Sequence, residues 1–295
     1  MLAPDTAGMT PTMRGQFPST PAQAPRASRR ERVVTRLAGV AVVAPAWLAG
    51  TADLWAQWIA LALAALAFGG LFAPVFDYRS WPPSPTPRTG WERLARFPVF
   101  WLGLAIFVYG AVAASNPWLA LTGEEARAWL EVLKFQPWLP RSVETPFWDM
   151  NAWHALLIIV PAWLVACAVW AGVETAGSLR ALLGVVAVNG GVLALLGLMQ
   201  RVSGTREMFW FYDPRPWFAE PTFFSTFVYP GHAGAWLLLA LGADLGCLIY
   251  ATTRRSWWAA FWGLLALCLF LPALQRSSFS IYFLFTLGLA AMVNC

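Results

Sequence analysis

The sequence predicts an all-α protein, a polytopic bundle of about eight transmembrane helices. Hydrophobic residues make up 59% of the 295 residues and charged residues only 12%, whereas soluble domains carry roughly 25% charged residues. The mean hydropathy is +0.56. Long runs without charge recur along the chain, and a helix needs about 20 apolar residues to cross a hydrocarbon core of ~30 Å. These observations together exclude a soluble fold.

The apolar runs lie within one expected membrane domain, residues 33–295. Transmembrane strands would show period-two alternation over about ten residues. The runs show no such alternation, so each is interpreted as a helix. Asp244 is the one acidic residue inside them. The expected spans are residues 33–52, 54–76, 98–115, 152–173, 181–200, 231–253, 256–275 and 277–295.

The placement of Arg and Lys predicts the orientation, because basic loops are retained in the cytoplasm. With the amino terminus inside, the inner segments hold 13 of the 20 basic residues and carry a net charge of +8, whereas the outer segments carry −2. This topology accounts for the basic pI of 9.3, so nucleic acid is not an expected partner. Residues 1–32 are rich in Pro, Thr, Ala and Arg and are predicted to form a disordered, basic cytoplasmic tail.

Metal and cofactor chemistry is not expected from this composition. The chain has two histidines and four cysteines, and no spacing among them is typical of a metal site or a disulfide framework. The cysteines are interpreted as packing residues. No phosphate loop, dinucleotide fingerprint or HExxH motif is present. Any catalysis is therefore expected to use arginine, one histidine and carboxylates.

Two long loops, residues 116–151 and 201–230, are expected on the outer side. In the first, Gly123–Lys134 is predicted to form a short helix in the headgroup layer, with Trp129 and Leu130 on its apolar face and Glu131 opposite. A solvated connector with an apolar underside is the alternative. The second loop is crowded with aromatic residues, which favour the membrane interface. We expect it to lie on the bilayer surface, in part as a re-entrant segment.

The second outer loop also carries the candidate site. Arg201, Arg206 and Arg215 lie in it, with Gln200 at the end of the fifth span and His232 at the start of the sixth. Guanidinium groups bind phosphate through paired hydrogen bonds, and aromatic faces can stack on sugars or isoprenoid chains. The pattern therefore indicates a site for a lipid diphosphate headgroup. The alternative is that these arginines merely extend towards lipid phosphates.

Two further residues are singled out by their positions. His232 follows a Pro-Gly break at a helix start, where a histidine can donate to an anion, carry a proton or simply cap the helix. Asp244 is expected about 18 Å further along that helix, where an unpaired carboxylate costs about 2.5 to 3.5 kcal/mol. Asn189 or Gln200 is the expected hydrogen-bond partner of Asp244, in a structural role or alternatively in a proton or substrate role. The glycines of the fifth span are expected to let neighbouring helices approach closely.

Three segments resemble the O-antigen ligase and polymerase family of bacterial membrane proteins. They are Asn189 to Gln200 (NGGVLALLGLMQ) with the following Ser203-Gly204-Thr205, then Phe227 to Ala233 (FVYPGHA), and more loosely Leu274 to Ser280 (LQRSSFS). The family has an apolar helix that ends in Gln, an outer loop, and a block F-V-x-R-N-H-x-A that opens the next helix. The resemblance extends over roughly residues 100–295.

The resemblance implies a metal-independent glycosyltransferase of the bacterial inner membrane. Such enzymes take lipid-linked oligosaccharides from an undecaprenyl diphosphate carrier at the periplasmic face. Carried over to this sequence, the diphosphate ligands are Arg201, Arg206, Arg215 and Arg276, and His232 assists transfer to an acceptor hydroxyl. The transfer is expected to combine stabilisation of the leaving diphosphate with general-base help to the acceptor.

This chain departs from the family in two ways. Pro230-Gly231 stands where the family has Arg-Asn, and the family continues through a large periplasmic loop and further spans beyond the position of Cys295. The chain therefore looks like the front half of such an enzyme, truncated or divergent. The alternative is a non-catalytic membrane subunit or a fragment that binds lipid-linked glycans. A small transporter would show an inverted repeat, and the sequence has none.

Overall fold

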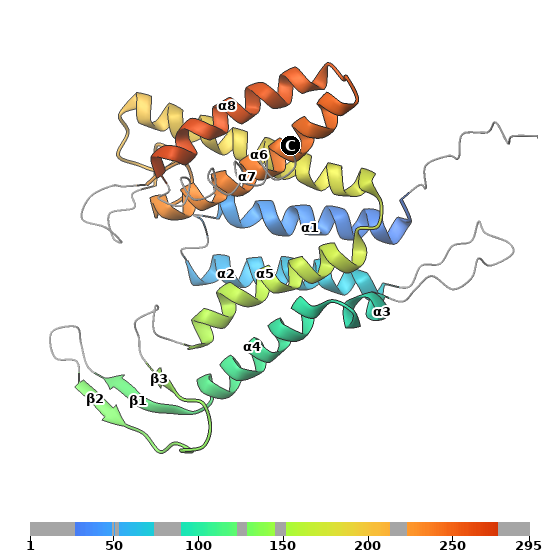
Figure 1. Ribbon diagram of the computed structural model, residues 1–295. Helices are drawn as coiled ribbons and strands as arrows, with labels where there is room; N and C mark the ends of the chain where they lie inside the picture. The colour runs from blue at the N-terminus through green and yellow to red at the C-terminus, as the bar shows by residue number, and fades with distance from the viewer. Residues whose placement is uncertain are drawn as a thin grey trace, which may run out of the picture.

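The computed structural model describes residues 27–48, 50, 53–73, 90–122, 129–144, 152–212 and 223–276, without the side chains of 121, 122 and 270–276. Eight α-helices and one three-stranded sheet make up this part of the chain (Figure 1). The helices are α1 (Arg29–Trp47), α2 (Leu54–Gly69, extended by the 3-10 turn η2, Gly70–Phe72), α3 (Gly90–Ala95), α4 (Pro98–Ala114), α5 (Ala152–Gly172), α6 (Ala176–Ser203), α7 (Pro230–Thr253) and α8 (Trp258–Arg276).

The described chain is mostly helical, as predicted, and four of its helices are long and apolar enough to cross a membrane. They are Leu54–Phe72, Ala152–Gly172, Ala176–Ser203 and Pro230–Thr253. The outward surfaces of the helices are apolar as well: six side chains on five helices are each 60% to 65% exposed, namely Leu102, Ile158, Leu195, Ile249, Leu264 and Leu267. A ring of exposed aliphatic side chains of this kind suits a lipid environment. The expected span 277–295 lies outside the described residues.

Helix α1 lies between two groups of helices and packs against both (Figure 1). Its first half, at Val34 and Ala38, belongs to a core shared with α2, α3, α4 and α5. Its end, at Ala46, belongs to a second core shared with α6, α7 and α8. Because one helix contributes to both cores, the two groups form a single bundle, and its ends are defined by where α1 begins and ends.

Close packing of α6 depends on its glycines, as the sequence predicts. A Cβ on Gly190 would collide with the Cβ of Ala240 on α7, and one on Gly191 would collide with Leu265 on α8. Gly184 has only ordinary contact distances, with Trp262 at 3.6 Å from the Cβ position. The expectation that small residues bring helices together is therefore confirmed at Gly190 and Gly191.

The loop after α4 forms a small sheet, and the surface helix predicted for Gly123–Lys134 is wrong in its described part. The strands are β1 (Pro117–Thr122), β2 (Trp129–Val132) and β3 (Ser142–Glu144), in the order β2-β1-β3, and β1 runs antiparallel to β2 and parallel to β3. Leu119 pairs with Val132 and Thr122 pairs with Trp129. Residues 129–132 form a strand because they pair with β1. Strand β1 lies outside the segment 123–134, so the periodicity of that segment alone does not indicate a strand.

Asn116 fixes the base of this sheet. Its Nδ2 donates to the carbonyl oxygens of Gln136 and Pro140, both at 3.1 Å, and its Oδ1 accepts from the backbone N–H of Gln136 at 2.8 Å. Arg141 lies 4.9 Å from the centre of the Phe135 ring, a cation–π distance. The buried side-chain amide of Asn116 thus connects the residue that precedes β1 to the segment that follows β2.

The first four residues of helix α1, residues 29–32, fall within the tail predicted for residues 1–32. Ser28 is its N-cap and accepts from the backbone N–H of Glu31 at 3.0 Å, as N-cap serines commonly do. The Glu31 side chain is buried, with 2% of its surface exposed. The expected disorder is therefore wrong for residues 29–32, and residues 1–26 lie outside the described part.

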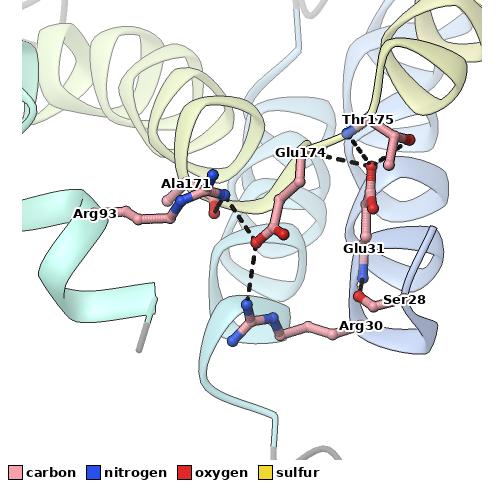
Figure 2. Close-up of polar contacts among 7 residues, drawn as sticks. All are labelled: Ser28, Arg30, Glu31, Arg93, Ala171, Glu174 and Thr175. Atoms are coloured by element: carbon pink, nitrogen blue, oxygen red, sulfur yellow. Dashed lines mark hydrogen bonds and ion pairs between the residues drawn. The ribbon is translucent and has the colours of Figure 1, made fainter. Parts of the chain in front are cut away.

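Glu31 joins the start of α1 to the start of α6 (Figure 2). Its Oε1 accepts from the backbone N–H of Glu174 at 3.0 Å, and from both the N–H and the hydroxyl of Thr175 at 2.7 and 2.8 Å. Thr175 in turn is the N-cap of α6 and accepts from the N–H of Ser178. We call this end of the bundle, where α1 and α6 begin, the Glu31 end. The opposite end, where α6 stops and α7 begins, is the Gln200 end.

The hydrogen bonds at Glu31 decide its ionisation. Burial by itself raises the pKa of the Glu31 carboxyl, but the hydrogen bonds from Thr175, Ser178 and Glu174 outweigh burial, and the net pKa lies below its ordinary value. A carboxyl whose pKa is lowered on folding stabilises the folded state above its unfolded pKa, and this contribution is lost as the pH falls through the folded pKa.

Replacing Glu31 by Gln is expected to destabilise the protein by about 1–3 kcal/mol at pH 7, because two backbone donors then lose a charged acceptor. Thermal unfolding in detergent measures this difference. The difference should shrink as the pH falls below about 4.3, the usual value for an unfolded Glu. Glu131→Gln, at an exposed position on β2, is the matched control and should leave the midpoint unchanged. Equal midpoints for Glu31→Gln and wild type at pH 7 would contradict this account.

Replacing Gly190 by Ala is expected to destabilise the protein by about 1–3 kcal/mol, since the new methyl forces α6 away from α7. Gly263→Ala is the control, because a Cβ at Gly263 meets nothing within 4 Å. This control should be neutral or slightly stabilising, since Ala favours a helix over Gly by about 1 kcal/mol. The measurement is again the unfolding midpoint, and similar effects of the two substitutions would refute the close contact.

Candidate functional site

The antiparallel packing of α6 and α7 brings the sequence-predicted residues to one end of the bundle. Gly190 lies against Ala240, and Leu183 lies 3.5 Å from the Cβ position of Gly246. Extending this alignment places Gln200, near the end of α6, at the level of the first turn of α7. The Gln200 end is at the left in Figure 1, where α6 stops and α7 begins. The end of α6 and the start of α7 are therefore neighbours.

Two of the predicted arginines are exposed at this end. Arg201 lies in the last turn of α6, where the helix dipole favours a positive charge. Arg206 follows Gly204, which ends the helix in the left-handed conformation with a φ of 65°. Arg206 forms neither a hydrogen bond nor an ion pair in the described part of the chain. Both guanidinium groups face outwards.

The other two arginines are placed less fully. Arg276 is the last residue of α8, and its side chain is not described. Trp262 of α8 lies against Gly184 of α6 and Leu265 lies against Gly191, so α8 runs in the same direction as α6 and ends near the Gln200 end (Figure 1). Arg215 lies outside the described residues.

His232 occupies the first turn of α7, as the Pro-Gly break predicts. The helix begins at Pro230, a residue suited to a first helical position. The side chain of His232 is exposed, and its ring meets that of Tyr229 edge to face, with centroids 5.1 Å apart. The N-cap is Tyr229, with no side-chain cap. His232 therefore does not cap the helix, and its imidazole faces the surface.

The described end of the second outer loop packs into the core of the bundle, where Phe224 and Phe227 are buried. Phe224 and Phe227 exchange backbone hydrogen bonds, each 3.0 Å long, across a tight turn. The Phe224 ring fills the space left by Gly197 on α6. Thr226 donates its hydroxyl proton to the carbonyl oxygen of Ala46 at the end of α1. The turn is thereby held against α1 and α6 together.

Ser225 at the tip of this turn was missed by sequence reasoning. It is fully buried and has a φ of 58°, a left-handed conformation that costs non-glycine residues roughly 1–2 kcal/mol. Its hydroxyl forms no hydrogen bond within the described residues. The available signal was a Ser-Thr pair inside an aromatic run, FFSTF. Strain combined with an unsatisfied polar group is typical of sites shaped for a ligand.

Gln200, which lies on α6, is also a buried polar residue. It is 2% exposed, and neither its Oε1 nor its Nε2 has a hydrogen-bond partner within the described chain. Gln200 lies three residues beyond Gly197 on the same face of α6, the face that meets Phe224. A buried polar group without a partner costs about 1–3 kcal/mol. Gln200 and Ser225 thus place unused donors and acceptors inside the Gln200 end.

Asp244 lies much deeper than Gln200, and its expected hydrogen bond is not formed. Its neighbour Ala243 packs against Val186 and Ala187 of α6, so Gln200 is about 20 Å further along the helix. The Oδ1 of Asn189 instead accepts from the indole N–H of Trp47 at 2.7 Å. Asp244 is fully buried, and neither of its carboxylate oxygens has a partner among the described residues. It is therefore separate from the surface arginines.

The described residues contain no group of three His, Cys, Asp or Glu side chains that would hold a metal ion. The positive charge available at the Gln200 end comes from arginine. Cys167 and Cys247 are buried and Cys268 is exposed, all as free thiols, while Cys295 lies outside the described part. The chemistry that the described site offers is therefore binding of an anion by guanidinium groups, hydrogen bonding by an amide and a hydroxyl, and proton transfer by one imidazole.

Comparison with known proteins gives no match: no family model, no curated protein and no solved structure is significantly similar to this chain.

Proposed function

We propose that this chain is an O-antigen ligase-like glycosyltransferase that uses glycans carried on undecaprenyl diphosphate. In this proposal it crosses the bacterial inner membrane eight times with a cytoplasmic amino terminus, and the Gln200 end faces the periplasm. The observation that carries the proposal is the composition of that end. Arg201, Arg206 and His232 are exposed at the end that also contains Gln200 and Ser225, which are buried and whose side-chain polar atoms have no hydrogen-bond partner among the described residues.

The proposed reaction assigns one task to each kind of side chain. The acceptor hydroxyl oxygen attacks the anomeric carbon of the lipid-linked sugar, the bond from that carbon to the diphosphate oxygen breaks, and His232 takes the hydroxyl proton. The bond electrons leave with the diphosphate, whose growing charge is stabilised by Arg201 and Arg206. Gln200 and Ser225 supply hydrogen bonds to the sugar, which would satisfy their buried groups.

A second candidate is a non-catalytic subunit that binds lipid-linked glycans. Pro230 begins α7 where the resembling family has arginine, so the first turn of this helix lacks a guanidinium group next to His232. Fewer positive charges leave less stabilisation for a departing diphosphate. Binding requires only the ground-state contacts, which Arg201, Arg206 and Gln200 still provide.

Transfer by the purified protein in lipid nanodiscs distinguishes the two candidates. The donor is an oligosaccharide on undecaprenyl diphosphate; a reaction without added acceptor reports polymerisation, and one with lipid A-core reports ligation. His232→Ala should lower kcat by about 10²- to 10⁴-fold, the range for loss of a general base, with donor affinity retained. Arg206→Ala should weaken donor binding about tenfold or more, in line with a charge-assisted hydrogen bond.

Arg36→Ala is the control, because Arg36 is exposed and lies on α1 away from the Gln200 end. The binding subunit would be supported if the wild type binds the donor without turning it over and Arg206→Ala loses this binding. Absence of both binding and turnover would reject both candidates.

A further inference from the structure

A cavity at the Glu31 end has a mixed lining that the proposed function does not use. It measures about 490 Å³ and lies between α3, the end of α5 and the start of α6. One wall is apolar, formed by Val169, Trp170, Val173 and Leu179. The other wall is charged and contains Glu92, Arg93, Arg96 and Glu174. A cavity with one apolar and one charged side at the end of membrane-length helices faces the headgroup layer.

Some charged side chains of this wall already form ion pairs within the protein. The Oε1 of Glu174 lies 2.8 Å from Nη1 of Arg93 and 3.4 Å from Nη2 of Arg30 (Figure 2). Arg93 also donates to the carbonyl oxygen of Ala171 at 3.1 Å. These contacts join α1, α3 and the α5–α6 connection. They hold the cavity open at a fixed width.

The rim carries one free charge of each sign. Glu92 lies in α3 and Arg96 directly follows the last residue of that helix; both line the cavity and both are exposed. In the part of the chain that the structure describes, neither forms a hydrogen bond or an ion pair. The cavity therefore presents an unpaired carboxylate and an unpaired guanidinium beside an apolar wall, with equal numbers of acidic and basic residues in its lining.

We propose that this cavity binds the headgroup of a zwitterionic phospholipid that has a primary ammonium group, as phosphatidylethanolamine has. Arg96 binds the phosphate, Glu92 binds the ammonium, and an acyl chain lies along Trp170. Trp170 is 58% exposed and stacks on Phe97 with ring centroids 4.6 Å apart, which gives the chain a rigid aromatic surface.

Charge balance favours this lipid over its common alternatives. An anionic headgroup would bring a net negative charge next to Glu92 without a matching excess of arginine. A quaternary ammonium group has no N–H and cannot donate hydrogen bonds to the carboxylate, whereas a primary ammonium has three donors. The site is at the opposite end of the bundle from Gln200, so the inference is independent of the glycosyltransferase proposal.

Native mass spectrometry of the full chain tests the inference. The protein is equilibrated in nanodiscs with equal amounts of phosphatidylethanolamine, phosphatidylcholine and phosphatidylglycerol of identical acyl chains, and the retained lipids are counted. Wild type should retain phosphatidylethanolamine about three- to fivefold over the other two, the range expected from one partly exposed ion pair. Glu92→Gln should bring the ethanolamine-to-choline ratio close to one, and Arg96→Gln should reduce retention of all three lipids.

Two exposed residues supply matched controls, Glu131→Gln on β2 and Arg36→Gln on α1, which should leave the ratios unchanged. Soluble phosphoethanolamine at millimolar concentration should not displace the lipid, because it lacks the acyl chain. Equal retention of the three lipids by wild type, an unchanged ratio in Glu92→Gln, a preference for phosphatidylglycerol, or displacement by phosphoethanolamine would each overturn the inference.

Discussion

The contact between α6 and α7 is the constraint on which the rest of the account depends. At Gly190 and Ala240 the two helices are so close that a methyl group on Gly190 has no room. In a membrane, where lipid tails are as apolar as the helices themselves, such close packing is a main source of helix association. The contact fixes how far each helix extends past the other. It therefore determines that Gln200 and His232 share one end while Asp244 stays near the middle.

Some boundaries of the apolar helices could be predicted from the sequence, because a bilayer sets the length of a span and excludes charge, whereas α6 extends from Ala176 to Ser203, beyond its predicted limits of 181 and 200. Helix α5 ends one residue before its predicted limit at 173, and α7 begins one residue before its predicted start at 231. The prediction was poorer where tertiary contacts decide. Helix α1 starts at Arg29 because Ser28 caps it and Glu31 is bound by Thr175, and a partner about 140 residues away leaves no local signal.

The candidate site was predictable in its location but not in its interior. Arginines, a histidine and a helix ending in Gln identified the Gln200 end, since charged and polar residues next to apolar runs mark interfaces. The burial of Ser225 could not be predicted, because it depends on the Phe224 ring filling the space at Gly197. The hydrogen bond expected for Asp244, which is not formed among the described residues, could not be judged from the sequence for a similar reason. Helix periodicity gives the depth of a residue along its helix, but it does not give the rotation of the neighbouring helix.

The two ends of the bundle differ in how their charges are arranged. At the Glu31 end, the buried carboxylate of Glu31 and the carboxylate of Glu174 are satisfied within the protein, so these contacts stabilise the fold. At the Gln200 end, the side chains of Gln200 and Ser225 are buried without hydrogen-bond partners among the described residues, and Arg201 and Arg206 are exposed. Proteins commonly concentrate strain and unmet hydrogen bonds where ligands bind.

Labelling of single cysteines from one side of the membrane tests most directly whether these two ends face opposite compartments. In a background without the native cysteines, Arg206→Cys and Thr253→Cys place one thiol at each end of the bundle, at exposed positions. An impermeant maleimide added to right-side-out vesicles should label Arg206→Cys and leave Thr253→Cys unlabelled until the membrane is opened. Labelling of both thiols from the outside, or of Thr253→Cys alone, would contradict the account.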